Sequence, residues 1–265
     1  MTTSLRASAT DCRIGHAVPC YFGAAERRLF GWLHRASGPA RMGGVLLCEP
    51  IGYDAILTHR TYRSMAEAFA VAGVTTLRFN YWGTGDSAGT DENGNSVEGW
   101  LASIDAARRE LERVCGDGPI TMVGVRMGGT LAMLSAAVRP VEQLVLFHPV
   151  VTGRSYLRGL RALAAITTNA DAATDGDWTL EAGGFLVPPE LQRTIEALTP
   201  QSVTQRPAAH VMLLHRDDLH VSSLLSTHLR ALGAAVEEAT VGGYADMMRD
   251  AHESVTPVAV ITAIA

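Results

Sequence analysis

The residues with the clearest capacity for chemistry form a tight turn, Gly124-Val-Arg-Met-Gly128. It follows the apolar run 120–123 and precedes a helix of small residues expected at 129–138. A strand, a sharp turn and a helix in this order form the nucleophile elbow, Gly-x-Ser-x-Gly, in which glycines allow the chain to turn without a clash. Here Arg126 replaces the central serine. The sequence therefore keeps the scaffold of a nucleophilic site and lacks its usual nucleophile.

The side chain at the centre of such a turn points into a pocket beside the N-terminal end of the following helix. Backbone N–H groups and the helix dipole favour an anion there, and the guanidinium of Arg126 adds a permanent charge and a forked set of donors. We therefore expect the pocket to hold a carboxylate, a phosphate or a developing oxyanion, with the backbone N–H of Met127 as a further donor. The alternative is an internal ion pair that holds Arg126 to Asp218 or Glu49 and fills an inactive site.

A second group of candidates lies at the end of the apolar run 44–48. Glu49 follows this run directly and is either a general acid–base or the ion-pair partner of the arginine. Cys48 is a displaced nucleophile if a nearby cation lowers its thiol pKa, or else a buried and inert cysteine. The following loop contributes Ile51 and Tyr53 as oxyanion or substrate-binding candidates, with a structural role as the alternative for the tyrosine.

Histidines elsewhere provide weaker candidates. His148 follows the apolar run 141–147 and either contacts the pocket or is a half-exposed structural residue. A group that would suggest a metal site straddles a strand end and a loop, and consists of His215, Asp217, Asp218 and His220. No recognised ligand motif fits these residues, and the four cysteines show no C-x-x-C spacing. We therefore expect neither a metal site nor a disulfide framework.

Strands and helices alternate along the chain, which is typical of a mostly parallel α/β sheet. Two short alternating segments between Ala17 and Leu33 flank Gly23–Glu26 and predict a hairpin. Buried strands are expected at 44–48, 74–80, 120–123, 141–147, 210–214 and 236–241. Helices are expected at 59–72, 96–114 with Ser96 as N-cap, 129–138, 221–232 and 257–265.

Residues 152–206 depart from this alternation. They are rich in Ala, Thr and Gly, and they contain Gly183-Gly184 and Pro188-Pro189. We predict that they form an inserted helical cap over the C-terminal ends of the strands, where ligands bind in open α/β sheets. The whole chain, 1–265, is expected to be a single domain, with a loose arm at 1–15.

Composition excludes several classes of function. A net charge of −5 provides no basic face for nucleic acid. All 22 basic residues are arginine, so lysine-bound PLP and imine chemistry are excluded. No apolar run reaches the roughly 18 residues of a membrane span, and residues 1–13 lack the apolar core of a signal peptide. We therefore expect a cytoplasmic protein.

The motifs resemble those of the α/β-hydrolase superfamily over about residues 17–265, and Phe79–Ser87 resembles the glycine-rich turn after the fourth strand of that fold. More narrowly, the sequence is similar to hydrolase-like proteins that accompany exosortase systems and to relatives beside secondary-metabolite genes. The marks of this subgroup are Cys48–Tyr53, Gly83–Gly89, Gly124–Gly128 and Gly243–Met248. The resemblance implies an α/β-hydrolase fold, and an arginine at the elbow as a trait of the subgroup.

The resemblance also implies positions for a catalytic triad. Arg126 occupies the position of the nucleophile. Matching the family's acid pattern within 215–221 makes Asp218 the acid, with Asp217 as the near alternative. Acyl-enzyme chemistry of the serine type needs a nucleophile and a base within hydrogen-bond reach, so it is not expected here.

The triad histidine should follow the strand at 236–241 by a few residues. The chain there contains Gly242-Gly-Tyr-Ala-Asp246 and no histidine. This leaves Tyr244 and Asp246 as substrate-binding candidates. His252 is the candidate for a displaced base, with a surface histidine at a helix start as the alternative reading.

These patterns predict an atypical enzyme of the hydrolase fold that acts on an ester, thioester or biosynthetic acyl intermediate. Arg126 would stabilise negative charge, and Glu49, Asp218 or His252 would move the proton. The alternatives are a non-catalytic protein that binds an acidic metabolite or a carrier-bound intermediate, and a Cys48-dependent hydrolase or acyltransferase. We expect a small acidic or acyl substrate and no cofactor, and leave open a carrier-protein partner and a homodimer.

Overall fold

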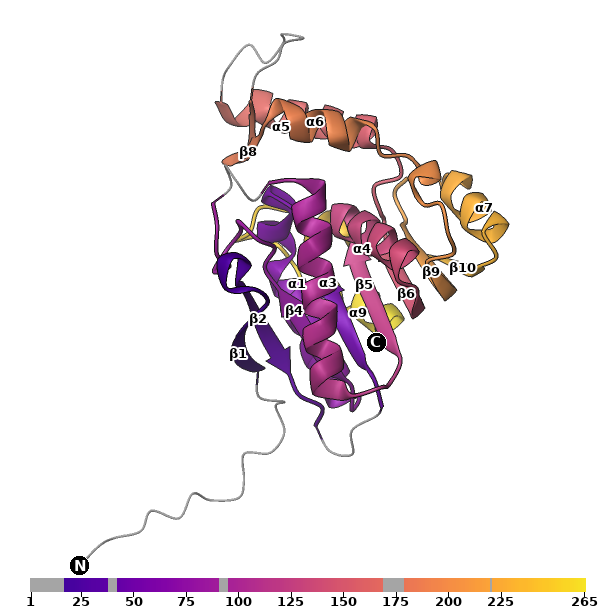
Figure 1. Ribbon diagram of the computed structural model, residues 1–265. Coiled ribbons are helices and arrows are strands. Elements are labelled where there is room, and N and C mark those ends of the chain that lie inside the picture. The colour runs from indigo at the N-terminus through magenta and orange to yellow at the C-terminus, as the bar shows by residue number, and fades with distance from the viewer. Residues whose placement is uncertain (1–16, 38–41, 91–94, 169–178, 220) are drawn as a thin grey trace, which may run out of the picture.

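The structure is a computed structural model that describes residues 17–37, 42–90, 95–168, 179–219 and 221–265. Its main strands are β1 (Ala17–Phe22), β2 (Leu29–His34), β3 (Gly44–Cys48), β4 (Thr75–Phe79), β5 (Ile120–Val125), β6 (Val141–Phe147), β9 (Ala208–Arg216) and β10 (Ala235–Val241). They form one eight-stranded sheet in the order β1-β2-β4-β3-β5-β6-β9-β10 (Figure 1). β2 pairs antiparallel with β1 and β4, and the other pairings in this sheet are parallel.

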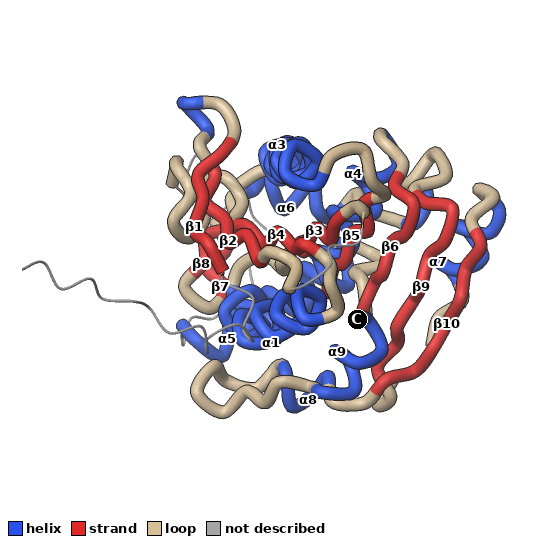
Figure 2. Tube along the Cα trace, turned by 90° about the horizontal axis from the view of Figure 1, so that it is seen from below, coloured by secondary structure: helices blue, strands red, loops and turns tan. Residues whose placement is uncertain are grey.

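Helices cover both faces of the sheet. Figure 2 shows α3 (Val97–Cys115) and α4 (Arg126–Val138) on one face, and α1 (Tyr53–Val71) and α9 (Val258–Ile264) on the other. Each face has its own cluster of buried apolar side chains, and β3 lies between the two clusters with all its residues buried. The other helices outside the cap are η1 (Ala25–Arg27), α7 (Leu224–Ala231) and α8 (Tyr244–Met247). This is the mostly parallel α/β architecture that the alternation of strands and helices predicts.

Several expected elements are confirmed at their expected positions. The hairpin forms from β1 and β2, and the buried strands at 44–48 and 141–147 have the predicted bounds. The side chain of Ser96 accepts the backbone N–H of Gly99 at 3.0 Å and so caps α3 as predicted. Continuous apolar runs and a capping serine are local signals, which explains why they could be recognised without tertiary information.

Two helices begin earlier than expected. α1 begins at Tyr53, and the expectation of a start at His59 was wrong. Gly52 has φ 67°, a conformation that glycine adopts readily, and the chain enters the helix directly after it. This places Asp54 in the first turn of α1. Likewise α4 begins at Arg126 and not at Gly129, so the elbow arginine is itself the first helical residue.

Between β6 and β9 the chain forms a separate layer, which we call the cap segment (152–206, of which 169–178 lie outside the described residues). It contains α5 (Gly153–Thr168), β7 (Leu180–Ala182), β8 (Phe185–Val187), α6 (Pro189–Glu196) and η2 (Pro200–Ser202). Figure 1 shows α5 and α6 lying beyond the end of the sheet at which β5 gives way to α4. The β7–β8 hairpin was not foreseen. It turns at Gly183-Gly184, both with positive φ.

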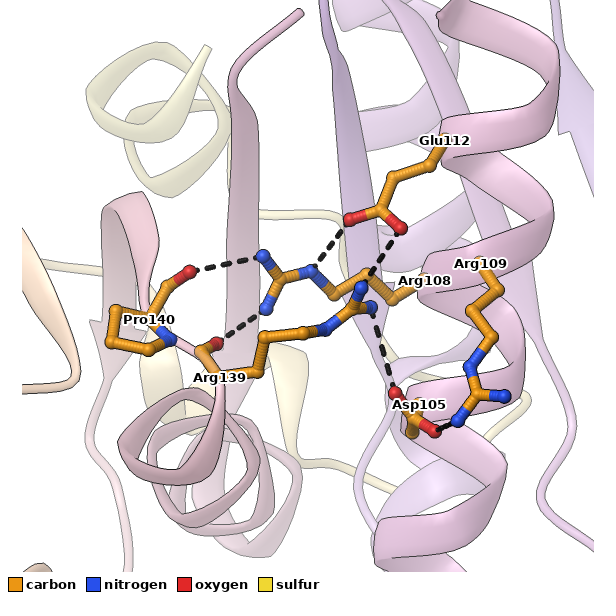
Figure 3. Close-up of polar contacts among 6 residues, drawn as sticks. All are labelled: Asp105, Arg108, Arg109, Glu112, Arg139 and Pro140. Atoms are coloured by element: carbon orange, nitrogen blue, oxygen red, sulfur yellow. Dashed lines mark hydrogen bonds and ion pairs between the residues drawn. The ribbon is translucent and has the colours of Figure 1, made fainter. Parts of the chain in front are cut away.

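A network of arginines and carboxylates joins α3 to the C-terminal end of α4 (Figure 3). The buried Arg108 of α3 donates to the carbonyl oxygens of Arg139 and Pro140, the second at 2.9 Å. Glu112 accepts from the Nε of Arg108 and from Nη1 of Arg139, both at 3.0 Å. Carbonyls at a helix end have no partner within the helix, so Arg108 caps α4 and holds it against α3.

Replacing Arg108 with alanine should lower the free energy of unfolding by about 2–3 kcal/mol, because buried carbonyls and Glu112 lose a charged donor. In a chain of this size that corresponds to a fall in Tm of roughly 5–10 °C, measurable by thermal and urea denaturation. The matched control is Arg109→Ala, since the Arg109 side chain is 71% exposed where it pairs with Asp105. That change should cost less than about 0.5 kcal/mol. Equal losses in the two variants would contradict the capping role.

Candidate functional site

The turn between β5 and α4 has the strained backbone that its motif predicts. Arg126 has φ 51°, a left-handed conformation that is uncommon for residues other than glycine. A Cβ at Gly128 would overlap the carbonyl oxygens of Cys48 and Glu49, and one at Gly124 would overlap the first turn of α4. The elbow therefore lies directly against the end of β3, and it presents the side chain of residue 126 at the C-terminal edge of the sheet.

A buried tyrosine completes the hydrogen bonding between the elbow and β3. The ladder between β3 and β5 ends with the pair Cys48 and Gly124. Just beyond it, the hydroxyl of Tyr62 donates to the carbonyl oxygen of Cys48 at 2.7 Å and accepts the backbone N–H of Val125 at 2.9 Å. Tyr62 thus holds the elbow in place from the α1 side of the sheet.

Arg126 is paired with a residue that the sequence analysis did not consider. Its Nε donates to Oδ2 of Asp54 at 2.8 Å, and the two side chains are 24% and 16% exposed. Its guanidinium carbon also lies 5.6 Å from the centre of the Tyr156 ring, which comes from the cap segment. Burial alone would lower the pKa of Arg126, but the nearby Asp54 carboxylate raises it, so the arginine stays charged.

The alternative of an internal ion pair is found with a different partner from those considered, because within the described part of the chain Arg126 pairs with Asp54 and not with Asp218 or Glu49. The cause is the early start of α1, which brings Asp54 to the elbow. The sequence does show an acidic residue, Asp54, two positions after Gly52. It can be recognised as a partner for Arg126 only once the start of α1 is known. Tyr156 gave no local signal, because nothing in the sequence fixes how the cap segment lies over the elbow.

Tyr244 occupies the position after β10 where the family pattern places its histidine. It is buried, and its ring centre lies 4.1 Å from the guanidinium carbon of Arg216 and 5.0 Å from the ring of His148. Burial raises the pKa of Tyr244, although the charges of Arg126 and Arg216 act in the opposite direction. The phenol is therefore neutral at pH 7, able to donate a hydrogen bond but unsuited to act as a base.

His148, which packs against this tyrosine, and Asp218, which pairs with Arg216, have different electrostatic settings. His148 has φ 45°, and burial together with the charges of Arg126 and Arg216 lowers its pKa to about 4. Asp218 accepts a two-pronged hydrogen bond from Arg216, which lowers its pKa. The carboxylate expected to serve as the triad acid is thus held by Arg216 at the protein surface, with a side chain that is 44% exposed.

Glu49 has the properties of a buried acid–base group. Its side chain is 8% exposed, and an Nη atom of Arg78 lies 3.9 Å from its carboxylate. Within the described ranges no side-chain or backbone donor lies at hydrogen-bond distance from that carboxylate. Burial raises the pKa of Glu49 to about 7, and the charge of Arg78 offsets only part of this effect. A carboxyl group that titrates near neutral pH is typical of functional sites.

Cys48 lacks the properties of a nucleophile. It is fully buried at the end of β3, and burial raises the pKa of its thiol far above the usual range, with the Glu49 charge acting in the same direction. Reactive cysteines are partly exposed and have a lowered thiol pKa. The structure therefore favours the inert alternative for Cys48.

The remaining candidates lie around the site or away from it. Tyr53 donates to Asp250 at 2.9 Å, and Asp246 pairs with Arg249 at 2.9 Å. The side chain of Met127 is buried, so its contribution would come from the backbone N–H at the start of α4. The side chain of His252 is 78% exposed and lies 3.6 Å from Glu253, which agrees with the alternative reading of a surface histidine.

The segment Gly85-Asp-Ser-Ala-Gly89 matches Gly-x-Ser-x-Gly in sequence, with the serine that the elbow lacks, but it does not form an elbow. Its Ser87 is buried, donates to the backbone oxygen of Asn80 at 2.8 Å and accepts the N–H of Phe30 at 2.9 Å. No strand leads into this turn at the serine and no helix starts there. Ser87 therefore holds the turn after β4 together.

Two adjoining cavities open at the ends of β3 and β4. One, of about 380 Å³, lies between these strand ends and the cap segment, and Ile51, Tyr53, Trp100 and Tyr156 are among its lining residues. The other, of about 480 Å³, is lined by Glu49, Ile51, Tyr81 and residues of α1. Three of the candidates named from the sequence, Glu49, Ile51 and Tyr53, thus line these cavities at one edge of the sheet.

Neither a metal centre nor a membrane span is found among the described residues. No group of three His, Cys, Asp or Glu side chains in these ranges is arranged to hold a metal ion, and His220 lies outside them. No helix in the same part of the chain has the length and apolar character to cross a bilayer.

A mostly parallel sheet with an elbow after β5, helices on both faces and a layer over the strand ends is the α/β-hydrolase fold. The family described as serine aminopeptidase, S33 matches residues 57–261, and the chain belongs to this family. No curated protein matches the sequence. The narrower resemblance to exosortase-associated proteins, with arginine as a subgroup trait, stays a prediction.

Solved structures of the same fold include hydrolases from distant organisms. Est1E from Butyrivibrio proteoclasticus with ferulic acid bound has a TM-score of 0.64 at 20% identity, covering 84% of this chain and 89% of that chain. An alpha-beta serine hydrolase homologue from Coxiella burnetii has a TM-score of 0.55 at 16% identity, over 85% and 87%. Mouse alpha/beta hydrolase domain-containing protein 10 has a TM-score of 0.55 at 21% identity, over 84% and 88%. At these identities the similarity shows the fold alone.

Because the pKa of Glu49 rises from 4.5 to about 7 on folding, the folded state holds this proton more tightly than the unfolded state. The wild-type chain should therefore lose stability as the pH rises through this window. Glu49→Gln should remove that loss, so that its stability relative to wild type increases by on the order of 3 kcal/mol between pH 4.5 and about pH 8. Urea denaturation across this range measures the effect.

The matched control for this prediction is Glu190→Gln, because Glu190 is an exposed glutamate of the cap segment. That variant should keep the wild-type dependence on pH. Parallel stability curves for wild type and Glu49→Gln would contradict the assignment of a raised pKa to Glu49.

Proposed function

We propose that the chain is an α/β-hydrolase-fold enzyme that acts on an acyl or carbonyl compound without a serine nucleophile. Arg126 and the backbone N–H of Met127 stabilise negative charge that develops on the substrate oxygen. Glu49 moves the proton as general acid–base. Hydrolysis by activated water, cyclisation and elimination are all compatible with these roles.

The observation that carries the proposal is the contact between the elbow and Glu49. Gly128, in the first turn of α4, lies against the backbone of Glu49. The start of α4, which favours an anion, is therefore in contact with the residue whose buried carboxyl group has a pKa of about 7. A catalytic acid–base works best when its pKa is near the operating pH. Asp218 and His252 support a catalytic role less well, since one is held by Arg216 and the other is exposed. The ferulic acid in the Est1E structure supports an acyl compound as substrate.

A second candidate function is favoured by the partner of Arg126. Its charge is already balanced by Asp54 at 2.8 Å, and the ring of Tyr156 lies near its guanidinium. An arginine neutralised in this way favours a non-catalytic protein that holds an acidic metabolite or a carrier-bound intermediate. The thiol alternative has no such support, because Cys48 is buried with a raised pKa.

Fluorophosphonate probes should not label the protein, and p-nitrophenyl esters should be poor substrates, because the nucleophile position holds Arg126. Intact-mass spectrometry after probe treatment measures labelling, with a serine esterase treated in parallel as the positive control. Stoichiometric labelling of any serine would contradict the proposal. Labelling of Cys48 would instead favour the thiol enzyme.

Substitutions at Arg126 separate the two candidate functions. If Arg126 stabilises an oxyanion, Arg126→Lys should lower turnover of acyl esters and thioesters about 100-fold with little change in Tm, because the planar fork is lost and the charge is kept. If the arginine is only a structural partner of Asp54, Arg126→Met should be tolerated or stabilising. Arg126→Ser should not restore an esterase, because Tyr244 occupies the position of the base. Arg154→Lys, at an arginine whose side chain is 81% exposed, is the matched control.

Turnover by acid release, ligand affinity by calorimetry and Tm are measured together for these variants. Unchanged turnover and affinity in Arg126→Lys, Arg126→Met and Arg126→Ser would rule out a functional role for the arginine. A wild-type protein that binds acyl compounds without converting them would establish the second candidate function.

A further inference from the structure

The carboxyl group of Glu49 is one end of a buried row of polar side chains that crosses the sheet. Arg78 of β4 lies between Glu49, which follows β3, and His34 of β2. Nη1 of Arg78 lies 3.9 Å from the Glu49 carboxylate, and its Nε donates to Nε2 of His34 at 3.3 Å. All three residues are buried. One guanidinium is therefore shared between a carboxylate on one side and an imidazole on the other.

The backbone of Arg78 is fixed by the sheet. β4 is paired on both sides, and Arg78 lies opposite Trp32 of β2 and Leu47 of β3. Leu47 belongs to the apolar cluster under α1, so the side chain of Arg78 points to that face as well. The centre of the Trp32 ring lies 5.6 Å from the guanidinium carbon, within the range of a cation–π contact. The gap between Arg78 and Glu49 is therefore set by the side chains and not by a mobile backbone.

His34 accepts the hydrogen bond because its ring is neutral. Burial and the charge of Arg78 lower the pKa of His34 to about 4, with Glu67 of α1 acting in the opposite direction and Arg63 of the same helix in the same direction. A neutral imidazole that accepts at Nε2 carries its proton on Nδ1. Nδ1 of His34 has no hydrogen-bond partner among the described residues. The bond from Arg78 is therefore what fixes the tautomer of this ring.

His34 and Glu49 compete for the same guanidinium. A hydrogen bond to the Glu49 carboxylate needs about 2.9 Å, so Nη1 would have to move about 1 Å from its present 3.9 Å. The two partners lie on opposite sides of β4, so this movement would stretch the bond of 3.3 Å to His34 beyond hydrogen-bond range. A buried carboxylate without a hydrogen-bonded cation holds its proton more tightly than a fully paired one.

From this competition we infer that His34 and Arg78 are positioning residues of the proposed site. His34 holds the guanidinium of Arg78 back from Glu49, so the carboxyl group stays loosely paired and able to give and take a proton. The inference deepens the proposed function and rests on it for the role of Glu49 as the acid–base group. It explains why the pKa of Glu49 is about 7 although a cation lies close to it.

The other groups near Glu49 do not replace Arg78. His59 and Arg60 of α1 line the adjoining cavity, and burial together with the charges of Arg78 and Arg63 lowers the pKa of His59. Within the described ranges Arg78 is the only cation paired with the carboxylate. Three neutral groups whose pKa is raised by burial also adjoin it, namely the thiol of Cys48 and the phenols of Tyr62 and Tyr81.

Titration of Glu49 by carbon-13 NMR tests the inference on the full chain, labelled at the side-chain carboxyl carbon of glutamate. The Glu49 resonance is assigned by its loss in Glu49→Gln. His34→Leu removes the acceptor and lets Arg78 close on the carboxylate, so proton binding at Glu49 should weaken at least about tenfold. Arg78→Met removes the cation, so proton binding should strengthen at least about tenfold. Unchanged proton affinity in either variant, or tighter proton binding in His34→Leu, overturns the inference.

His34→Gln is the conservative variant, because its amide oxygen can accept from Arg78. Its proton affinity at Glu49 should stay within about threefold of wild type, and a glutamine variant that behaves like His34→Leu contradicts the role of the acceptor. The matched control is Arg63→Met, at a side chain that is 65% exposed, which should change the affinity less than about twofold.

Two measurements keep the test independent of folding in His34→Leu. His34→Phe also removes the acceptor, keeps a ring in place and should weaken proton binding in the same way. In the wild-type chain at pH 7, nitrogen-15 NMR of the histidine rings should show His34 protonated at Nδ1 and not at Nε2. A proton on Nε2 overturns the inference whatever the variants do.

The titrations need no substrate, so the outcomes separate this inference from the proposed function. A chain whose Glu49 titrates as predicted in these variants and that converts no acyl compound refutes the enzyme and leaves the role of His34 standing. In an active enzyme, the acidic limb of the pH profile of kcat/KM should move to lower pH in His34→Leu. Activity that is lost in Glu49→Gln, with a profile that does not move in His34→Leu, overturns the role of His34 and leaves Glu49 as the acid–base group.

Discussion

The close approach of the elbow to the end of β3 is the contact on which the site depends. Gly128 meets the carbonyl oxygens of Cys48 and Glu49 where any larger residue would overlap them. This contact holds Arg126 in a left-handed conformation at the start of α4, which costs on the order of 1–3 kcal/mol for a residue other than glycine. The packing of β5 between β3 and β6 maintains this conformation. At the other end of α4, Arg108 donates to the backbone carbonyl oxygen of Pro140 and holds that end in place.

Charge at this edge of the sheet is balanced pair by pair. Arg126 is matched by Asp54 and Arg216 by Asp218, while Tyr244 lies between the two arginines as a neutral ring. Buried or half-buried charges persist at tolerable cost when each has a partner with good geometry. Glu49 is the exception, because its nearest described cation is 3.9 Å away and its pKa moves to about 7 instead. This loosely paired carboxyl group is for this reason the one that we propose as the acid–base group of the site.

Much of the fold could be predicted because its signals are local. The apolar runs that become β3 and β6, the serine that caps α3 and the glycine spacing of the elbow are each contained within a few residues. Asp54 could not be recognised as the partner of Arg126, because its role depends on the turn at Gly52 that starts α1 early. Tyr156 could not be placed either, since the position of the cap segment over the elbow is a tertiary property. The burial of Cys48 and the exposure of His252 likewise depend on packing that periodicity does not contain.

The hydroxyl of Tyr62 serves as a substitute for main chain at the point where β3 and β5 separate. A crevice between parallel strands normally leaves an amide on one strand and a carbonyl on the other without partners. One phenolic oxygen that accepts from Val125 and donates to Cys48 supplies both missing bonds from a neighbouring helix. The sheet can therefore split open at this point without exposing its backbone to the apolar interior, and the loop after β3 is free to diverge toward α1 while the elbow turns toward α4. One side-chain oxygen bridges the opening, so its width is set by the two hydrogen bonds that meet at this oxygen and not by the spacing of a ladder.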